Sequence, residues 1–570
     1  MRASWAWPGK LRETERVFIG CKKPDARSPM QEGGYMTSHG RILSAIFSVV
    51  LLSSACYGAT ITGTVKGTDG VAFQGAFVEA QNTQTRMTFI ALSDTQGHYR
   101  VENVAAGDYR VGIRAPGYRA DAQTGVKLAA GQDSSLDFSL QKGVVRWSDI
   151  SIYQADKLWP AAPAKDKIFD TCFTCHGFQT RMAAVTRDAD GWQDRVAFMR
   201  TAMKFGLEDQ VTDPEADMIA AYLTKLFGPD SVLPKSPADM PEYKDTLRPL
   251  SSNAMNIEYV EYDMPGPSRM PFSAAPGKDG YLWIPNFGVA NKITRLDPKT
   301  GATEDFAVPN IGTAAIHSAV EAPDGKVWLT EQGSDKLGVW DPQTKTITEY
   351  QDRRIPGKLG YAAGSKHTLR FDADGNVWFS GRPLGKFDPK TNEYTDSPEV
   401  HASYDVKEDQ NGNIWFTKQD TNQFGMIDTK TMKVSIYTPL TKNSFPRRLE
   451  IDPSGIVWSG EFRGGKLLRF DPKTQEVKEF DLPGPQPTPY GLGVDTKGNI
   501  WYASYNMDVI GCFDPQTEKI VEYPFPHSEN TIREFFRDAD GRLWYGTPSN
   551  NKVGYFYLKG SPASSARAGK

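Results

Sequence analysis

Between about residues 255 and 560, short apolar runs alternate with polar turns in a pattern that recurs along the chain. Each unit contains Gly-x-x-Trp, and the seven tryptophans are Trp283, Trp328, Trp378, Trp415, Trp458, Trp501 and Trp544. Their spacings are 45, 50, 37, 43, 43 and 43 residues, and each unit has the pattern of four short strands joined by tight turns. Because about 43 residues with four strands make one blade, the pattern predicts a seven-bladed β-propeller over residues 255–560.

The two ends of this array predict how the propeller closes. The last unit stops after three strands, at residues 553–557, and lacks a fourth. A matching segment stands at the start instead, because residues 261–265 (Glu-Tyr-Asp-Met-Pro) resemble the fourth-strand segment 479–483 (Glu-Phe-Asp-Leu-Pro). We therefore expect the N-terminal strand to complete the last blade, which removes the free sheet edges where the two ends meet.

Residues 60–141 contain short stretches in which apolar and polar residues alternate, such as 61–65 and 76–80, separated by Gly/Asp turns. Such strands predict a small β-sandwich. The segment resembles the carboxypeptidase regulatory-like domain at Gly75-Ala76, at the Gly107-x-Tyr109 strand and at Pro116-Gly117-Tyr118. The resemblance implies a prealbumin-like fold with a binding or spacer role.

Residues 145–240 have helical periodicity instead. An apolar face recurs at helical spacing at Trp192, Val196, Met199 and Met203. A second helix is predicted over residues 216–227, where Gly228-Pro229 ends it. The chain is therefore predicted to be a multidomain, mainly β protein with one α-helical domain between the sandwich and the propeller.

The most specific short motif of the chain is C-x-x-C-H at Cys172-Phe173-Thr174-Cys175-His176. Two thiols three residues apart can each bond one vinyl group of a porphyrin, and the adjacent histidine then reaches the iron. A thioredoxin-like C-x-x-C site and a chance match are the alternatives, but the first needs a βαβ context that the sequence lacks. The motif predicts one covalent haem c with His176 as the proximal iron ligand.

About 90 residues around this motif resemble class I-type cytochrome c domains, including the Tyr222-Leu223 pair in the last helix. The resemblance implies a sixth iron ligand, usually a methionine thioether. The candidate methionines are Met182, Met199, Met203 and Met218. Cytochromes of similar layout often carry a tryptophan followed by a methionine seven residues later, which points from Trp192 to Met199. Met203, or an open position on the iron, is the alternative.

An apolar run at residues 42–52 follows Arg41 and precedes small residues up to Ala59. This layout is typical of a signal peptide and is too short for a membrane span. We therefore expect cleavage near Ala59 and release of a periplasmic protein with no transmembrane span.

The segment before this run, residues 1–35, fits no targeting pattern, so we expect Met36 to be the true start and residues 1–59 to be absent from the mature protein. Lipoprotein anchoring through Cys56 is disfavoured, because Ser53 occupies the position where an apolar residue is expected.

Length and charge limit the partners. A chain of 570 residues implies several domains. The formal net charge is −3 and no basic stripe is present, which argues against nucleic acid as a partner.

The blade repeat also gives a register for residues near the propeller axis, where ligands of such scaffolds bind. Eight residues before each turn glycine stand Phe272, His317, His367, Tyr404, Arg447, Tyr490 and Arg533. Two histidines, two arginines and three aromatic residues favour an anionic or aromatic small-molecule ligand over a solvated channel of unselected polar residues. The candidate catalytic residues are His317, His367, Arg447, Arg533 and Tyr490.

The repeat resembles the streptogramin lyase (virginiamycin B lyase) propeller family over about 300 residues. That resemblance implies proton abstraction by a histidine base, a magnesium ion held by glutamate, and a Glu-x-His motif at the axial position. No axial position here has glutamate two residues earlier, and Glu399-Val400-His401 lies three residues ahead of Tyr404. The axial histidines remain candidate bases, and Glu331 or Glu461 is a candidate ligand of a hard cation.

Together these patterns predict a periplasmic mono-haem c-type cytochrome that exchanges electrons with a periplasmic partner and is coupled to ligand binding by the propeller. A streptogramin lyase-like carbon–oxygen lyase is one alternative, with the haem serving elsewhere. A non-catalytic binding or scaffold protein is the other.

Overall fold

The structure is a computed structural model that describes residues 58–202, 211–267, 269–310, 312–352, 366–397 and 399–560. The expected signal peptide with Cys56, the expected start at Met36, and Met203 lie outside the described residues. Within those ranges, none of the helices has both the length and the apolar character that a membrane crossing requires.

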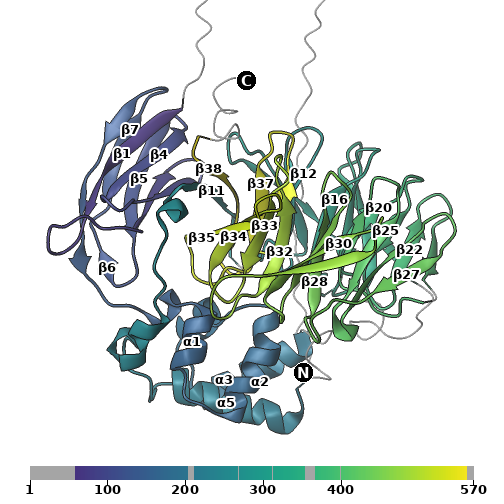
Figure 1. Cartoon of the computed structure of the whole chain (residues 1–570), viewed down its shortest axis with the longest axis horizontal. Helices are drawn as coiled ribbons and strands as arrows, with labels where there is room; N and C mark the ends of the chain where they lie inside the picture. Colours follow the sequence, from purple (N-terminus) through teal and green to yellow (C-terminus); the bar gives the residue numbers. More distant parts are fainter. Residues whose placement is uncertain are drawn as a thin grey trace, which may run out of the picture. The chain divides into compact units, whose positions relative to one another are not determined.

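Seven four-stranded antiparallel blades occupy the described part of the repeat region, one for each Gly-x-x-Trp unit (Figure 1). The first three are β12 (Ala275–Pro276), β13 (Leu282–Pro285), β14 (Lys292–Leu296) and β15 (Thr303–Ala307); β16 (Ile316–Glu321), β17 (Val327–Glu331), β18 (Lys336–Asp341) and β19 (Thr346–Gln351); and β20 (Leu369–Phe371), β21 (Val377–Phe379), β22 (Gly385–Asp388) and β23 (Glu393–Asp396). The next three are β24 (Val406–Glu408), β25 (Ile414–Lys418), β26 (Gln423–Ile427) and β27 (Val434–Tyr437); β28 (Pro446–Ile451), β29 (Val457–Glu461), β30 (Lys466–Asp471) and β31 (Glu476–Asp481); and β32 (Pro489–Val494), β33 (Ile500–Ser504), β34 (Val509–Asp514) and β35 (Lys519–Pro524).

The seventh blade is closed by a strand from the start of the array, as predicted. It contains β36 (Phe536–Arg537), β37 (Leu543–Thr547) and β38 (Lys552–Leu558), and β11 (Ile257–Asp263) pairs antiparallel with β38. The first strands of the blades contact one another in a closed circuit, from β12 through β16, β20, β24, β28 and β32 to β36 and back to β12. The predicted seven-bladed propeller is therefore present.

A hydrogen bond inside the turn accounts for the repeat tryptophan in most of the blades. In five blades the indole Nε1 of the repeat tryptophan donates to the aspartate that opens the turn, at 2.7 to 3.1 Å. In the fifth blade, the same Asp452 carboxylate accepts from the backbone N–H of Ser454 and of Ile456. Gly455 between them has φ +86°, a conformation that favours glycine. The Asp, the Gly and the Trp thus form one local unit.

The sandwich shares a sheet with the propeller, which the sequence did not predict. Strand β11 pairs on its other edge with β3 (Met87–Leu92), so an eight-stranded sheet runs β36-β37-β38-β11-β3-β2-β5-β7. Its sandwich part includes β2 (Phe77–Asn82), β5 (Gly107–Arg114) and β7 (Gln123–Leu128). Six of the seven residues of β11 are buried. The outer edge of the last blade is therefore covered by the sandwich.

The second layer of the sandwich is built around β1 (Ala59–Lys66). It pairs with β4 (His98–Val104), β8 (Asp133–Ser135) and β9 (Phe138–Ser139), and β6 (Tyr118–Arg119) pairs with β10 (Gln141–Lys142). The two layers enclose one apolar cluster that continues into the propeller, where Tyr262, Trp544 and Tyr555 belong to it.

Helices fill the segment between the sandwich and the propeller (Figure 1). They are η1 (Trp147–Asp149), α1 (Ile152–Leu158), α2 (Pro163–Thr171), η2 (Cys172–Thr174), η3 (Gln179–Ala183), α3 (Ala189–Ala202), α5 (Asp213–Phe227), η4 (Pro237–Asp239), η5 (Pro241–Thr246) and η6 (Ser252–Met255). A capping box between Thr212 and Glu215 starts α5 three residues before the predicted helix. The helical core packs around Trp159 and continues into Phe462, Tyr490 and Tyr505 of the propeller.

We predict that Asp452→Ala lowers the free energy of unfolding by about 2 kcal/mol, because it leaves the buried Trp458 indole N–H and two backbone donors without their acceptor. The measurement is a urea titration followed by tryptophan fluorescence. Asp471→Ala is the control, because the Asp471 carboxylate accepts from the Lys473 backbone in another turn of the same blade. Equal losses in both variants would contradict the importance of the indole contact.

Candidate functional site

The C-x-x-C-H segment lies at the end of α2. Cys172 and Cys175 are free thiols; Cys172 begins the short helix η2, Cys175 caps its end, and His176 follows with 6% of its surface exposed. The Nδ1–H of His176 donates to the Gly177 carbonyl oxygen at 2.6 Å, which leaves Nε2 with its lone pair. Burial, assisted by Arg181, lowers the pKa of His176 to about 3. The imidazole is therefore neutral and held in the tautomer that a metal ligand needs.

A cavity of about 180 Å³ lies beside this segment, and we call it the helical cavity. Its lining includes Cys172, Cys175 and His176. Its apolar wall includes Met182, Val196, Met199, Val211, Ile219 and Leu223, and its arginines are Arg181, Arg187, Arg195 and Arg200. The buried Nε1 of Trp192 and the buried Nε atoms of Arg181 and Arg200 have no hydrogen-bond partner in the described ranges. Such a lining suits a flat apolar group that carries acidic substituents.

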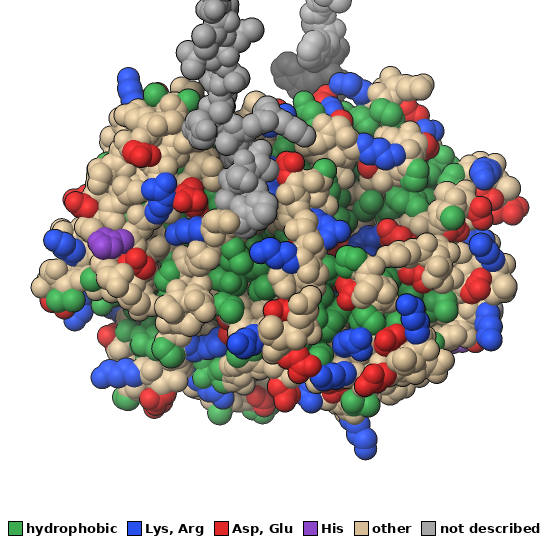
Figure 2. Space-filling view, turned by 45° about the horizontal axis from the view of Figure 1, so that its top comes forward, with side chains coloured by type: hydrophobic (Ala, Val, Ile, Leu, Met, Phe, Trp, Pro, Cys, Tyr) green, Lys and Arg blue, Asp and Glu red, His purple; other side chains and the backbone are tan. Residues whose placement is uncertain are grey.

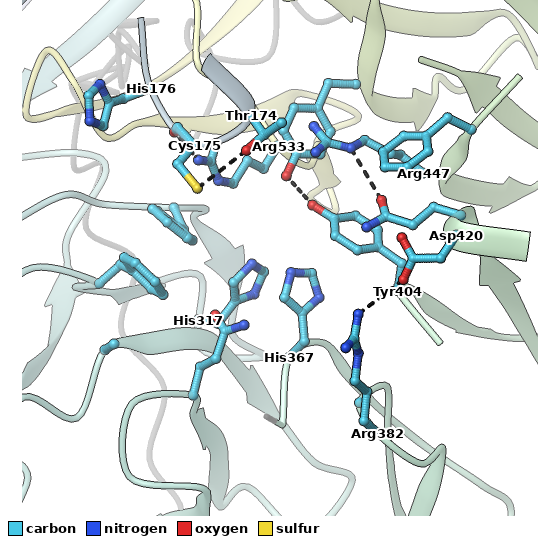
Figure 3. A pocket seen from close by; sticks show the side chains of 18 of the residues that line it. Thr174, Cys175, His176, His317, His367, Arg382, Tyr404, Asp420, Arg447 and Arg533 are labelled. Carbon is cyan, nitrogen blue, oxygen red and sulfur yellow. Dashed lines mark hydrogen bonds and ion pairs between the residues drawn. The ribbon is translucent and has the colours of Figure 1, made fainter. Parts of the chain in front are cut away.

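The predicted axial residues meet in a second and larger space, which we call the axial cavity. It has a volume of about 820 Å³, and all seven residues of the predicted register line it (Figure 3). They are Phe272, His317, His367, Tyr404, Arg447, Tyr490 and Arg533. The repeat register therefore located the axial side chains correctly.

Two of these residues, His317 and His367, form a close histidine pair whose rings are tilted by 35°. The ring centroids of His317 and His367 are 3.7 Å apart, and both side chains are buried. Burial lowers the pKa of each well below 6.5, and Arg448 and Arg533 add to that effect. The Nδ1 atom of each ring is buried and has no hydrogen-bond partner within the part of the chain that the structure describes. Both histidines are thus neutral and have an unused nitrogen.

Next to the histidines, two tyrosines share a hydrogen bond. The hydroxyl groups of Tyr404 and Tyr490 bond to each other, and the Arg447 guanidinium lies 4.3 Å from the Tyr490 ring centroid. Burial would raise the pKa of Tyr490, but Arg533 and Arg447 outweigh it and lower that pKa below its ordinary value. Burial raises the pKa of Tyr404. Tyr404 is therefore the donor of this hydrogen bond whenever Tyr490 is ionised.

The propeller holds the C-x-x-C-H segment directly. Arg533 donates to the backbone carbonyl of Cys175, and the Glu529 carboxylate accepts from the backbone N–H of Thr180 at 3.0 Å and from its hydroxyl at 2.8 Å. Five residues line both cavities, and these are Cys175, His176, Arg181, Arg195 and Met199. The two cavities therefore share a wall. Sequence reasoning missed this contact, because spacing within one segment carries no information about its neighbour in space.

A layer of buried ion pairs lies one residue further along the first strands. Arg448 pairs with Asp405 at 3.0 Å, and Arg370 pairs with Glu534. Three of these residues directly follow axial residues in the sequence, so extending the predicted register by one position would have found them. Their charges cancel, whereas among the described residues no carboxylate pairs with Arg447 or Arg533 of the axial cavity.

The expected hard-cation ligands are elsewhere. Glu331 and Glu461 are absent from the lining of the axial cavity and are buried within their blades, near Glu349 and Glu479 respectively. Burial raises the pKa of both to about 8, so they are protonated at neutral pH. The described residues contain no group of three His, Cys, Asp or Glu side chains placed to hold a metal ion.

Of the candidate distal methionines, Met182 and Met199 line the helical cavity, and Met199 lines the axial cavity as well. Met218 lines neither, and Met203 lies outside the described residues.

Comparison with known proteins confirms two of the resemblances. Residues 389–565 match the virginiamycin B lyase family, and residues 60–141 match the carboxypeptidase regulatory-like domain. The first match begins directly after β22 and includes the fourth, fifth and sixth blades and three strands of the seventh, whose remaining strand β11 lies outside it. No curated protein matches the chain.

Solved structures similar to the chain include a streptogramin B lyase, with 25% identity and a TM-score of 0.48, covering 54% of this chain and 100% of that one. The virginiamycin B lyase from Staphylococcus aureus has 20% identity and a TM-score of 0.48, covering 53% and 99%. The extracellular domain of a hybrid two-component system from B. thetaiotaomicron has 15% identity and a TM-score of 0.41, covering 50% and 40%.

We predict that the stability of the protein falls as the pH drops from 6.5 to 5, partly because of His317 and His367. Below pH 6.5 the unfolded chain binds protons at these histidines that the folded chain does not, since their folded pKa values are lowered. Each contributes up to about 1.4 kcal/mol per pH unit. Urea titrations across this range should show a shallower dependence for the double variant His317→Gln/His367→Gln. His98→Gln, at an exposed position, is the control, and a double variant with the parent's slope would contradict the prediction.

Proposed function

We propose that the protein is a mono-haem c-type cytochrome whose propeller holds a ligand against the haem. When bound, the haem supplies reversible one-electron oxidation and reduction. The observation that supports this proposal best is the shared wall, because Cys175, His176 and Met199 line both the helical and the axial cavity.

The residues of the helical cavity fit this cofactor. Cys172 and Cys175 would form the two thioether bonds, and His176 would bind the iron through Nε2, the nitrogen that its hydrogen bond to Gly177 leaves available. The arginines of the cavity suit the two acidic groups of a haem, and the methionine-rich wall suits its apolar ring. Met199 remains our choice for the distal ligand.

The surrounding residues control the site by position and charge. Arg533 links the carbonyl of Cys175 to the propeller axis, so the attachment loop and the axial ligand site are held at fixed separation. The neutral His317 and His367 can accept a proton that a ligand loses on oxidation. We propose export to the periplasm and electron exchange with a periplasmic partner, with the sandwich serving as a spacer or binding module.

We predict that the protein, produced with working haem-maturation machinery, carries one covalent haem, seen as a Soret band and as the added porphyrin mass. Cys172→Ala/Cys175→Ala should lose the covalent haem completely, because both thioether bonds are removed. Cys512→Ala is the control, since Cys512 lies on β34 in the sixth blade and should leave haem attachment unchanged. A parent protein without a Soret band or added mass would overturn the proposed function.

The match to the virginiamycin B lyase family favours a second candidate, a carbon–oxygen lyase. His317 and His367 are buried, neutral bases in a cavity of suitable size. The carboxylates that line this cavity are Asp170 and Asp420, and Glu331 and Glu461 are not among its lining.

We predict that the purified protein does not linearise a streptogramin B in the presence of magnesium, because glutamates that could hold the ion are missing from the cavity lining. Mass spectrometry of the antibiotic is the measurement. Linearisation that is abolished in His317→Ala and retained in the exposed-site variant His98→Ala would favour the lyase instead.

A further inference from the structure

We infer that the axial cavity binds a small aromatic carboxylate, and that Arg447 contacts its carboxylate group. The inference deepens the proposed function, since it names the class of ligand held beside the haem. It rests on that function only for the ligand's redox role, because the binding itself depends on propeller residues alone.

The axial cavity is lined by more positive than negative side chains. Seven arginines and lysines line the axial cavity against two aspartates, Asp170 and Asp420, and Asp420 already pairs with Arg382 at 3.1 Å. Among the described residues, no carboxylate lies within ion-pair distance of Arg447 or Arg533. The outer surface is different, because Figure 2 shows side chains of both signs interspersed over the visible face. The cavity thus has an excess of positive charge that an anionic ligand would neutralise.

Arg447 has an unused hydrogen-bond donor. Its side chain is 3% exposed, and its Nη1 atom is buried with no hydrogen-bond partner among the described residues. Its Nε donates to Gln419 at 3.3 Å (Figure 3). A buried donor without an acceptor is costly, and burial of a charged group without a counterion costs more. A carboxylate that reaches Nη1 would remove both costs.

Aromatic rings surround the Arg447 guanidinium and limit the directions from which a ligand can reach it. The Arg447 guanidinium lies 4.2 Å from the Phe462 ring centroid and 4.3 Å from that of Tyr490. These two rings are 5.7 Å apart and 74° from parallel, so at most one of them can lie on a face of the guanidinium, and the Nη1 donor has no partner among the described residues. A planar carboxylate matches the edge of a guanidinium with two parallel hydrogen bonds, which a spherical anion such as chloride does not.

The walls of the axial cavity are rich in aromatic rings, which bears on the part of the ligand beyond its carboxylate. Phe272 and Phe287 stack at 4.1 Å on one wall of the cavity, and Phe445, Tyr404 and Tyr490 contribute further rings. The unpartnered Nδ1 atoms of His317 and His367 offer hydrogen bonds to a polar substituent. Aromatic walls with a few placed polar groups favour an aromatic ring over an aliphatic chain.

The test is isothermal titration calorimetry on the full haem-loaded protein, with benzoate as the probe and benzamide as its neutral isostere. We expect benzoate to bind with one site per chain and benzamide to bind at least about tenfold more weakly, since benzamide lacks the charge. Arg447→Gln should weaken benzoate binding by about tenfold or more and leave benzamide binding unchanged. Arg447→Lys should lie between, because it keeps the charge and loses the planar fork.

Arg469→Gln is the matched control, because Arg469 lies on β30 of the same blade as Arg447 but outside the cavity lining, and it should bind benzoate like the parent. The Soret band and the urea midpoint report whether each variant is folded. If Arg447→Gln does not fold, the parent's preference for benzoate over benzamide decides the question.

The outcomes separate this inference from the proposed function. A haem-loaded protein that binds benzoate no better than benzamide, or whose folded Arg447→Gln variant binds benzoate unchanged, overturns the inference and leaves the cytochrome standing. A protein without haem that still binds benzoate through Arg447 supports the anion site and overturns the redox function.

Discussion

The pairing of β11 is the constraint on which the arrangement of this protein depends. This one strand completes the last blade through β38 and joins the sandwich through β3. The helical segment leaves the sandwich after β10 and must return to β11, so its two ends are fixed at neighbouring places in one structure. Contacts along this segment, such as the hydrogen bond from the Tyr153 backbone N–H to the Asn506 carbonyl oxygen, hold it against the propeller.

Of two layers of charged residues at the propeller axis, one is neutral overall and the other carries a net positive charge. In the layer of Arg448, Asp405, Arg370 and Glu534 every charge has a partner, and the low dielectric of the interior strengthens those ion pairs. In the layer of Arg447 and Arg533 the positive charges face a cavity. The first layer is neutral overall, whereas among the described residues Arg447 and Arg533 have no carboxylate partner, and this difference is the basis of the anion site that we infer.

The comparison between sequence and structure shows which features a repeat can predict. The period of the Gly-x-x-Trp unit fixed the number of blades and the register of residues such as His317 and Arg533, because equivalent positions of equivalent blades face the same way. The same reasoning was wrong for Glu331 and Glu461. They end the second strand of a blade, one strand further from the axis, where they pack against neighbouring strands instead of the cavity.

The contacts that join the sandwich, the helical segment and the propeller could not be predicted from the sequence. The β3 to β11 pairing and the Arg533 to Cys175 contact join residues that are 167 or more positions apart in the chain, and no periodicity relates them. The eight-stranded sheet and the shared wall of the two cavities both follow from such contacts. The C-x-x-C-H motif and the axial residues can each be predicted from sequence patterns, but tertiary packing alone brings them together.

The family match and the site chemistry concern different residues, and this explains why they favour different functions. The match covers residues 389–565 and therefore the turns, tryptophans and strands of the last four blades, which specify a scaffold. His317 and His367 lie before it, and Cys172, Cys175 and His176 lie in a segment that a propeller does not require. The proposed function depends on these added residues, because they place a cationic cavity against the C-x-x-C-H motif. The function must therefore be argued from them.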